Sequence, residues 1–184
     1  MTEFRLRAAT LDDIPAITEI YRPAVASGTA SFELEPPTAD EMRRRFEAIV
    51  RAGYPYLVAE QGGVVIGYGY ANAYRTRPGY RFSVEDSIYV AEGQQGKGIG
   101  RALLSQLIDA CTAKGYRQMI AVIGDSAQWA SIGLHRALGF TFCGTIHSVG
   151  YKHGRWLDSI IMQRSLGEGD RTQPSEIPSP SARG

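Results

Sequence analysis

The chain has 184 residues, 43% hydrophobic and 21% charged, and its 20 Lys and Arg nearly balance its 19 Asp and Glu. This length predicts one domain that folds without disulfides or metals, and the balanced charge argues against a dedicated nucleic-acid binder. The apolar runs are far shorter than the ~20 residues of a membrane helix, and the first residues lack the pattern of a signal peptide. Two cysteines, Cys111 and Cys143, are too few for a disulfide scaffold and lack metal-ligand spacing. We therefore expect a soluble, cytoplasmic protein with no metal and no membrane or nucleic-acid partner.

Strand and helix signals alternate along the first half of the chain. Residues 4–8 alternate as a strand does, and Thr10 then begins a helix that runs to about residue 26. Thr38 with Glu41 forms a second capping signal, which begins a helix to about residue 51. The next signals predict a hairpin around a glycine turn and then a third strand, with strands over 54–60, 64–74 and 82–90.

The second half adds two helices and three strands. Apolar residues at i, i+3 and i+4 spacing predict a helix over 99–114. The later segments are a strand (117–123), a helix (about 127–138) and two strands (140–149 and 156–165). The order β α α β β β α β α β β predicts an α+β, or layered α/β, domain in which helices cover a mixed sheet.

One folded domain is expected over residues 1–166. The segment beyond it contains three prolines and almost nothing apolar. Such a composition cannot bury enough surface to offset the entropy of ordering, so we expect 167–184 to be a disordered tail.

Glycine is over-represented, and the excess gathers in one loop. The chain has 21 glycines, and four of them fall within residues 93–100, between a predicted strand and a predicted helix. Backbone N–H groups there can converge on an anion at the helix N-terminus, with Lys97 and Arg101 adding charge. The loop is neither a Walker A motif nor a dinucleotide fingerprint, because Ile99 follows Gly98 and Arg101 replaces a glycine. The alternative is that the glycines only allow tight packing of helix on strand.

Two motifs carry a resemblance to a known family. The pattern Gln95-x-x-Gly98-x-Gly100 resembles the pyrophosphate-binding motif of the GCN5-related N-acetyltransferases, the GNAT family. The segment from Ser131 to Phe140, SIGLHRALGF, is similar to the family's fourth conserved segment. This resemblance implies a mostly antiparallel mixed sheet flanked by helices, and acetyl-CoA as the co-substrate.

Longer segments narrow the resemblance to one branch and extend it over residues 1 to about 165. They are SVEDSIYV, QGKGIGRALL, ASIGLHRALGF and GYKHGRWLDSIIMQ. They resemble the phosphinothricin and methionine sulfoximine N-acetyltransferases. Members of that branch acetylate the α-amino group of small amino-acid analogues, usually as homodimers, and the resemblance implies the same here.

The resemblance also implies which residues bind acetyl-CoA. Backbone groups of residues 88–90 would hold the thioester and the pantetheine arm, and the glycine loop would hold the pyrophosphate. Gln128 stands where relatives usually have an asparagine that binds pantetheine. The expected set is Ile88, Tyr89, Val90, Gln95, Gly96, Lys97, Gly98, Ile99, Gly100, Arg101 and Gln128.

Glu85 is the expected general base, and His135 the expected general acid. Strand alternation puts Glu85 on a polar face, and the resemblance places the family's base there. The same alternation puts Asp86 on the apolar face, where a carboxylate must be paired or perturbed; a β-bulge would exchange the two roles. His135 falls where many relatives have a tyrosine that protonates the leaving thiolate. The alternatives are a solvated Glu85 and a histidine that only packs.

The acceptor is expected at the turn over residues 74–81. Guanidinium groups bind carboxylates and phosphinates in bidentate fashion, so the turn suits a small anionic amino acid, although a solvated basic hairpin tip would look the same. The expected acceptor residues are Tyr74, Arg75, Arg77, Tyr80 and Phe32, of which Phe32 would close over the acceptor from an earlier loop. The segment over residues 152–156 is interpreted as a loop with a basic turn, which would make at most a dimer or lid contact.

Two other functions stay open. One is a GNAT enzyme for another amine, such as a polyamine, an aminoglycoside or a protein N-terminus, which the arginine turn disfavours. The other is a non-catalytic module that binds an acyl-CoA, which Glu85 on the polar face disfavours.

Overall fold

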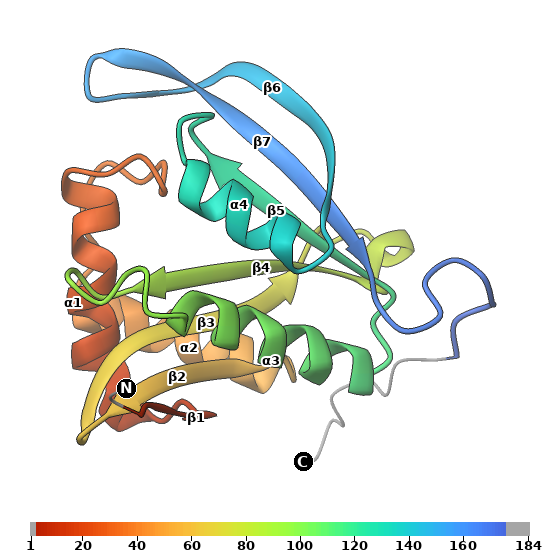
Figure 1. Ribbon diagram of the computed structural model, residues 1–184, viewed down its shortest axis with the longest axis horizontal. Helices are drawn as coiled ribbons and strands as arrows, with labels where there is room; N and C mark the ends of the chain where they lie inside the picture. Colours follow the sequence, from red (N-terminus) through yellow and green to blue (C-terminus); the bar gives the residue numbers. More distant parts are fainter. Residues whose placement is uncertain (1–2, 176–184) are drawn as a thin grey trace.

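The computed structural model describes residues 3–175, and its elements follow the predicted order (Figure 1). The strands are β1 (Arg5–Ala8), β2 (Tyr56–Gln61), β3 (Val64–Ala73), β4 (Ser83–Val90), β5 (Gln118–Gly124), β6 (Thr141–Lys152) and β7 (Arg155–Ser165). The helices are α1 (Ile14–Ala26), α2 (Ala39–Arg51), α3 (Ile99–Ala113) and α4 (Trp129–Ala137), with short 3₁₀ turns at Leu11–Asp13 and Pro78–Tyr80.

The seven strands form one mixed sheet in the order β1-β2-β3-β4-β5-β7-β6. All neighbouring pairs are antiparallel except β4 and β5, which run parallel. Helices α3 and α4 cover one face of the sheet, and α1 and α2 cover the other (Figure 1). The predicted fold class, a mostly antiparallel mixed sheet flanked by helices, is confirmed.

Residues of β2 and β3 divide between the two faces by alternation. Tyr56, Val58 and Tyr68 are buried against α1 and α2. On the opposite face, glycine allows α3 and β4 to approach closely. A Cβ at Gly69 would lie 2.6 Å from the Cδ1 atom of Ile88 and 3.1 Å from the carbonyl oxygen of Ser87, so a larger residue would force the neighbouring strand or its side chain to shift. Glycine at this position therefore allows the neighbouring elements to pack closely on this face of the strand.

The two parallel strands separate soon after they begin to pair. They are in register only from Ser83↔Gln118 to Glu85↔Ile120, although β4 continues to Val90 and β5 to Gly124. Asp86 is therefore the first residue of β4 beyond the paired segment. The sheet opens from this point, and the opening positions the site described below.

The prediction of a loop over residues 152–156 is wrong, because β6 and β7 continue almost to the tip of their hairpin. His153 and Gly154 form the turn alone, with φ angles of 50° and 75°. Two consecutive positive φ angles are those of a type I′ turn, whose twist matches that of the strands. Lys152 is therefore buried rather than part of a solvated loop, and its Nζ donates to the carbonyls of Ala24 and Ser31 at 3.3 and 2.7 Å.

The chain continues beyond residue 166 as hydrogen-bonded turns. Leu166 is buried in the core, and the Gly169 amide donates to its carbonyl at 2.9 Å. Arg117 donates to the Thr172 side chain at 2.7 Å. The first part of the predicted disordered tail is thus attached to the domain. The rest of the predicted tail, residues 176–184, lies outside the described residues.

Candidate active site

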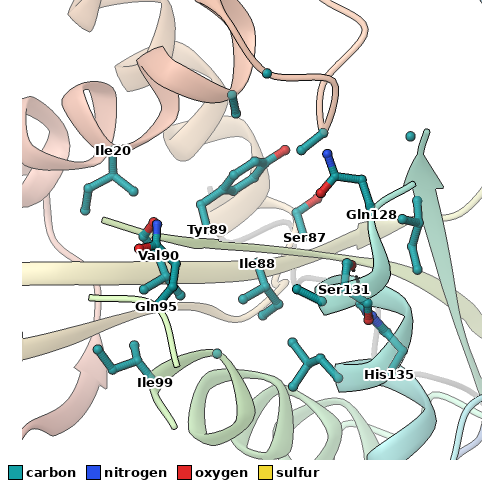
Figure 2. A pocket seen from close by; sticks show the side chains of 18 of the residues that line it. Ile20, Ser87, Ile88, Tyr89, Val90, Gln95, Ile99, Gln128, Ser131 and His135 are labelled. Carbon is teal, nitrogen blue, oxygen red and sulfur yellow. Dashed lines mark hydrogen bonds between the residues drawn. The ribbon is translucent and has the colours of Figure 1, made fainter. Parts of the chain in front are cut away.

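A cavity of about 680 Å³ occupies the opening between β4 and β5. Its wall combines residues 86–90 of β4, residues 121–124 of β5, the glycine loop with the start of α3, and one side of α4. Figure 2 shows Gln95 and Ile99 at one end of the cavity, and Gln128, Ser131 and His135 at the other. The cavity therefore connects the predicted phosphate loop to the predicted catalytic histidine.

The glycine loop has backbone angles that favour glycine. Gly96 and Gly98 have φ angles of 76° and 84°, in the left-handed region that other residues rarely adopt. Gly98 is the N-cap of α3, and the first turn of this helix carries no acidic residue. Arg101 in that turn faces the cavity. The positive end of the helix dipole and the guanidinium therefore lie together, as an anion site requires.

Nearly all the predicted cofactor residues line this one cavity. The exception is Lys97, whose Nζ donates to the side chain of Gln94 at 2.8 Å. Gln95 donates from its amide to the carbonyl of Val90 at 3.3 Å and so ties the loop to the end of β4. Gln128 donates to the hydroxyl of Thr29 at 3.0 Å, which links α4 to the loop after α1.

Glu85 lies next to the cavity, on the face of β4 opposite to that of Asp86. It pairs across the sheet with Asn72 of β3, and its side chain is not part of the cavity wall. Burial and the nearby charge of Asp86 raise the pKa of Glu85 to about 7, although the charge of Arg75 opposes this shift. A carboxylate with a pKa near neutrality can accept and release a proton at working pH.

Asp86 and His135 form a buried pair at the inner end of the cavity. Their side chains are 1% and 5% exposed, and His135 Nε2 lies 3.0 Å from an Asp86 carboxylate oxygen. Nδ1 of the same ring lies 2.7 Å from the carbonyl oxygen of Ser131. Both ring nitrogens are engaged within the protein, so proton donation by His135 requires one of these bonds to open. The expectation that Asp86 would be buried and paired is confirmed.

Burial and hydrogen bonding act in opposite directions on His135. Burial alone lowers the pKa of the ring, but the hydrogen bond and charge of Asp86 and the Ser131 carbonyl outweigh it and raise the pKa. The edge of the ring contacts Phe140, with centroids 4.9 Å apart. His135 therefore both packs in the core and carries a polar pair.

The predicted acceptor residues lie outside the cavity wall. In the turn before β4, the Tyr74 and Tyr80 rings meet edge to face, and the Arg75 guanidinium lies 5.1 Å from the centroid of Tyr74. Arg77 is exposed in the same turn. The charge of Arg75 lowers the pKa of Glu85 against the larger effects of burial and Asp86.

Phe32 occupies a slot made by two glycines. A Cβ at Gly124 would lie 2.9 Å from the Phe32 ring, and one at Gly150 would lie 2.5 Å from it. The predicted role of Phe32 as a cover over the acceptor stays a prediction. The slot shows instead that the loop after α1 is seated on β5 and β6.

The residues that hold the loop after α1 were not predicted from sequence patterns. Asp125 accepts hydrogen bonds from the hydroxyl of Thr29 at 2.8 Å and from the guanidinium of Arg155 at 2.5 Å. Lys152 donates to the Ser31 carbonyl from the other side. The contacts of Asp125 with Thr29 and of Lys152 with Ser31 join residues 96 and 121 positions apart, and that of Asp125 with Arg155 joins residues 30 apart, so local patterns do not reveal them.

The sequence profile of the Acetyltransferase (GNAT) domain matches residues 6–161. The chain belongs to the GNAT acetyltransferase family. The family expected from the glycine loop is thus confirmed, and with it the prediction of an acetyltransferase enzyme.

Several relatives share the full GNAT domain with this chain. A phosphinothricin N-acetyltransferase of Alcaligenes faecalis is 52% identical over 92% of this chain and 86% of that protein. An L-methionine sulfoximine/L-methionine sulfone acetyltransferase of Salmonella typhimurium is 44% identical over 89% and 95%. The crystal structure of a GNAT phosphinothricin acetyltransferase from Sinorhizobium meliloti in complex with AcCoA is 55% identical, with a TM-score of 0.92 over 96% and 95% of the chains.

Within residues 3–175, no three His, Cys, Asp or Glu side chains are grouped as a metal ion would require. None of the helices in the described part of the chain is long and apolar enough to span a membrane.

Proposed function

We propose that this enzyme transfers acetyl from acetyl-CoA to the α-amino group of a small amino acid or a toxic analogue. Phosphinothricin and methionine sulfoximine or sulfone are the acceptors that its named relatives suggest. The observation that carries the proposal is the cavity between β4 and β5, which is lined by all the predicted cofactor residues except Lys97.

The cavity suits acetyl-CoA in one orientation. The glycine loop, the N-terminus of α3 and Arg101 offer an anion site at one end, which fits the pyrophosphate. The thioester, at the far end of the extended pantetheine arm, would then point toward Ser87, Ile88 and His135. Backbone groups of residues 88–90 would bind the arm along the edge of β4, where β5 no longer pairs with it.

The acceptor amine would reach the thioester from the face of Glu85. An ammonium group gives one proton to Glu85, and the free amine attacks the thioester carbon. The C–S bond then breaks, and the nitrogen loses a second proton as the amide forms. One proton ends on the CoA sulfur, with His135 as our candidate donor, and the proton on Glu85 leaves to solvent. The second proton from nitrogen restores His135.

Arg75 is our candidate for binding the carboxylate of the acceptor. Its guanidinium lies over Tyr74 and acts on Glu85, so an acceptor held there would present its α-amine near the base. Tyr80, Arg77 and Phe32 stay predicted members of the acceptor site.

Release of free CoA tests this function. The enzyme is incubated with acetyl-CoA and, in turn, phosphinothricin, methionine sulfoximine, methionine sulfone and spermidine. We expect turnover with at least one amino-acid acceptor and little with spermidine. Turnover only with spermidine would favour another amine acceptor, and acetyl-CoA binding without turnover would favour a non-catalytic module.

We further propose that the enzyme is a homodimer. β6 is an edge strand, and large apolar side chains on it and at the start of β7 are exposed: Phe142, Ile146, Val149, Tyr151 and Trp156. A long apolar edge strand left open favours association with another chain, and a second copy would cover it. The cytoplasmic location stays a prediction.

A further inference from the structure

The buried pair of Asp86 and His135 has a protonation state that follows from its neighbours. The Ser131 carbonyl can only accept a hydrogen bond, so Nδ1 of His135, 2.7 Å away, must carry a proton. The remaining proton lies between Nε2 and Asp86, 3.0 Å apart. Either the pair is an imidazolium with a carboxylate, or it is a neutral ring with a carboxylic acid.

The contacts of the ring favour the charged form, because a doubly protonated ring donates both to the Ser131 carbonyl and to one carboxylate oxygen of Asp86. Its other carboxylate oxygen is buried and has no hydrogen-bond partner among residues 3–175. A buried carboxylate oxygen without a donor is costly for the charged form, so this form depends on the hydrogen bond and the positive charge that His135 supplies to the other oxygen. The ring in turn would lose its charge through burial if Asp86 were absent.

Other titratable groups near the pair do not replace either partner. Cys111 on α3 and Glu85 on β4 both respond to the charge of Asp86, which raises their pKa values along with burial. Both are therefore poor sources of a compensating charge. On α4, His135 is held by its own helix through Ser131, and the Phe140 ring closes its side.

The pair lies at the point where β4 and β5 stop pairing. Asp86 follows Glu85↔Ile120, the last paired position of β4 and β5. His135 comes from α4, the helix that follows β5. The bond between them thus joins β4 to α4 where the cavity begins, and both residues line the cavity.

We propose that Asp86 is a positioning residue that keeps His135 as an oriented imidazolium at the inner end of the cavity. This inference rests on the proposed function for its catalytic consequence. A positive ring there would stabilise the leaving thiolate and supply its proton, while Glu85 takes the proton of the amine on the opposite face of β4.

The protonation state is tested first on the wild-type protein without substrates. Long-range ¹H–¹⁵N correlation spectra of ¹⁵N-histidine-labelled protein report whether each ring nitrogen carries a proton. We expect His135 to be doubly protonated at pH 7, and the exposed His147, which lies 3.4 Å from Asp158, gives a surface histidine for comparison in the same spectra. A neutral His135 ring with an unprotonated Nε2 at pH 7 would overturn the proposal, and no variant has to fold for this result.

Asp86→Asn then tests the dependence of the ring on the carboxylate. We expect His135 to become neutral at pH 7, with kcat reduced about 10- to 100-fold and KM for acetyl-CoA changed less than about threefold. Adding His135→Gln to this variant should cause little further loss, because the two residues act as a unit. Asp158→Asn removes the surface Asp–His pair and should leave kcat unchanged.

The outcomes separate this inference from the proposed function. A doubly protonated His135 that Asp86→Asn leaves unchanged would overturn the role of Asp86. Likewise, a loss confined to KM for acetyl-CoA would show a role in shaping the cavity and would contradict the inference. An inactive wild-type protein with the charged pair intact would contradict the proposed function, while the ring's response to Asp86→Asn would still support the positioning role.

Discussion

Glu85 and Asp86 are neighbours in the chain but face opposite sides of β4, and this separates their environments. Glu85 is half-buried opposite Asn72, whereas Asp86 is buried against His135. Strand alternation was enough to predict this division, since successive side chains of a strand point to opposite faces. Alternation could not predict the partner of Asp86, because His135 lies 49 residues away and reaches it only through the packing of α4.

The raised pKa of Glu85 leads to a prediction on pH dependence. Only the ionised carboxylate accepts a proton, and burial with the charge of Asp86 raises its pKa to about 7. We therefore expect kcat/KM to rise with pH through about 7 and to level off above it. Glu85→Gln should lower kcat/KM by roughly 10²–10⁴-fold and remove this rise. Initial rates from pH 5.5 to 9 measure both effects.

A matched substitution on α2, Glu47→Gln, serves as the control and should leave the pH profile unchanged. A loss below about threefold in Glu85→Gln would show that another group or a water relay removes the proton.

At the scale of elements, periodicity and caps predicted every helix and strand, with ends shifted by a few residues. Thr38, for example, caps α2 by accepting from the amide of Glu41 at 3.2 Å, as its sequence signal indicated. The tip of the β6–β7 hairpin was mispredicted because His153 takes a positive φ angle that usually marks Gly, Asn or Asp. The slot for Phe32 had no signal at all, since it is formed by Gly124 and Gly150 on different strands.

The glycine loop yields a prediction on cofactor affinity. Gly98 has a φ angle of 84° at the start of α3, so Gly98→Ala strains the backbone by about 1 kcal/mol and distorts the anion site. We expect KM for acetyl-CoA to rise about tenfold with kcat nearly unchanged, because binding rather than chemistry is affected. Steady-state kinetics with varied acetyl-CoA measures the two constants separately.

Gly63 offers a close control for this change. Its φ angle is 83°, and the space around its missing Cβ is open, as at Gly98, but it lies in the β2–β3 turn outside the cavity wall. Gly63→Ala should show the same loss of stability without the rise in KM. An equal rise in both variants would mean that strain, and not the anion site, is responsible.

The whole molecule combines a split sheet with an open edge. The split between β4 and β5 holds the cavity, while the edge at β6 is left apolar and exposed. The strand order β5-β7-β6 could not be derived from the residues alone, because it depends on a late hairpin adding beside β5. The family resemblance implied only a mostly antiparallel mixed sheet flanked by helices.

The exposed edge predicts the oligomeric state. Sedimentation velocity at micromolar concentration should give a dimer. Val149→Glu places a charge on the apolar edge of β6 and should shift the protein toward monomer. Val64→Glu is the control, since Val64 is a similarly exposed strand valine, 62% against 51% for Val149, and lies on β3. A monomeric wild-type protein would contradict the proposed dimer.

Identification of the acetylated product tests the central claim most directly. The enzyme is incubated with acetyl-CoA carrying a ¹³C-labelled acetyl group and with phosphinothricin or methionine sulfoximine, and the product is examined by mass spectrometry and NMR. We predict one labelled acetyl group on the α-nitrogen and an equal amount of free CoA. Hydrolysis of acetyl-CoA without labelled amino acid, or no consumption with any amino-acid acceptor, would contradict the account.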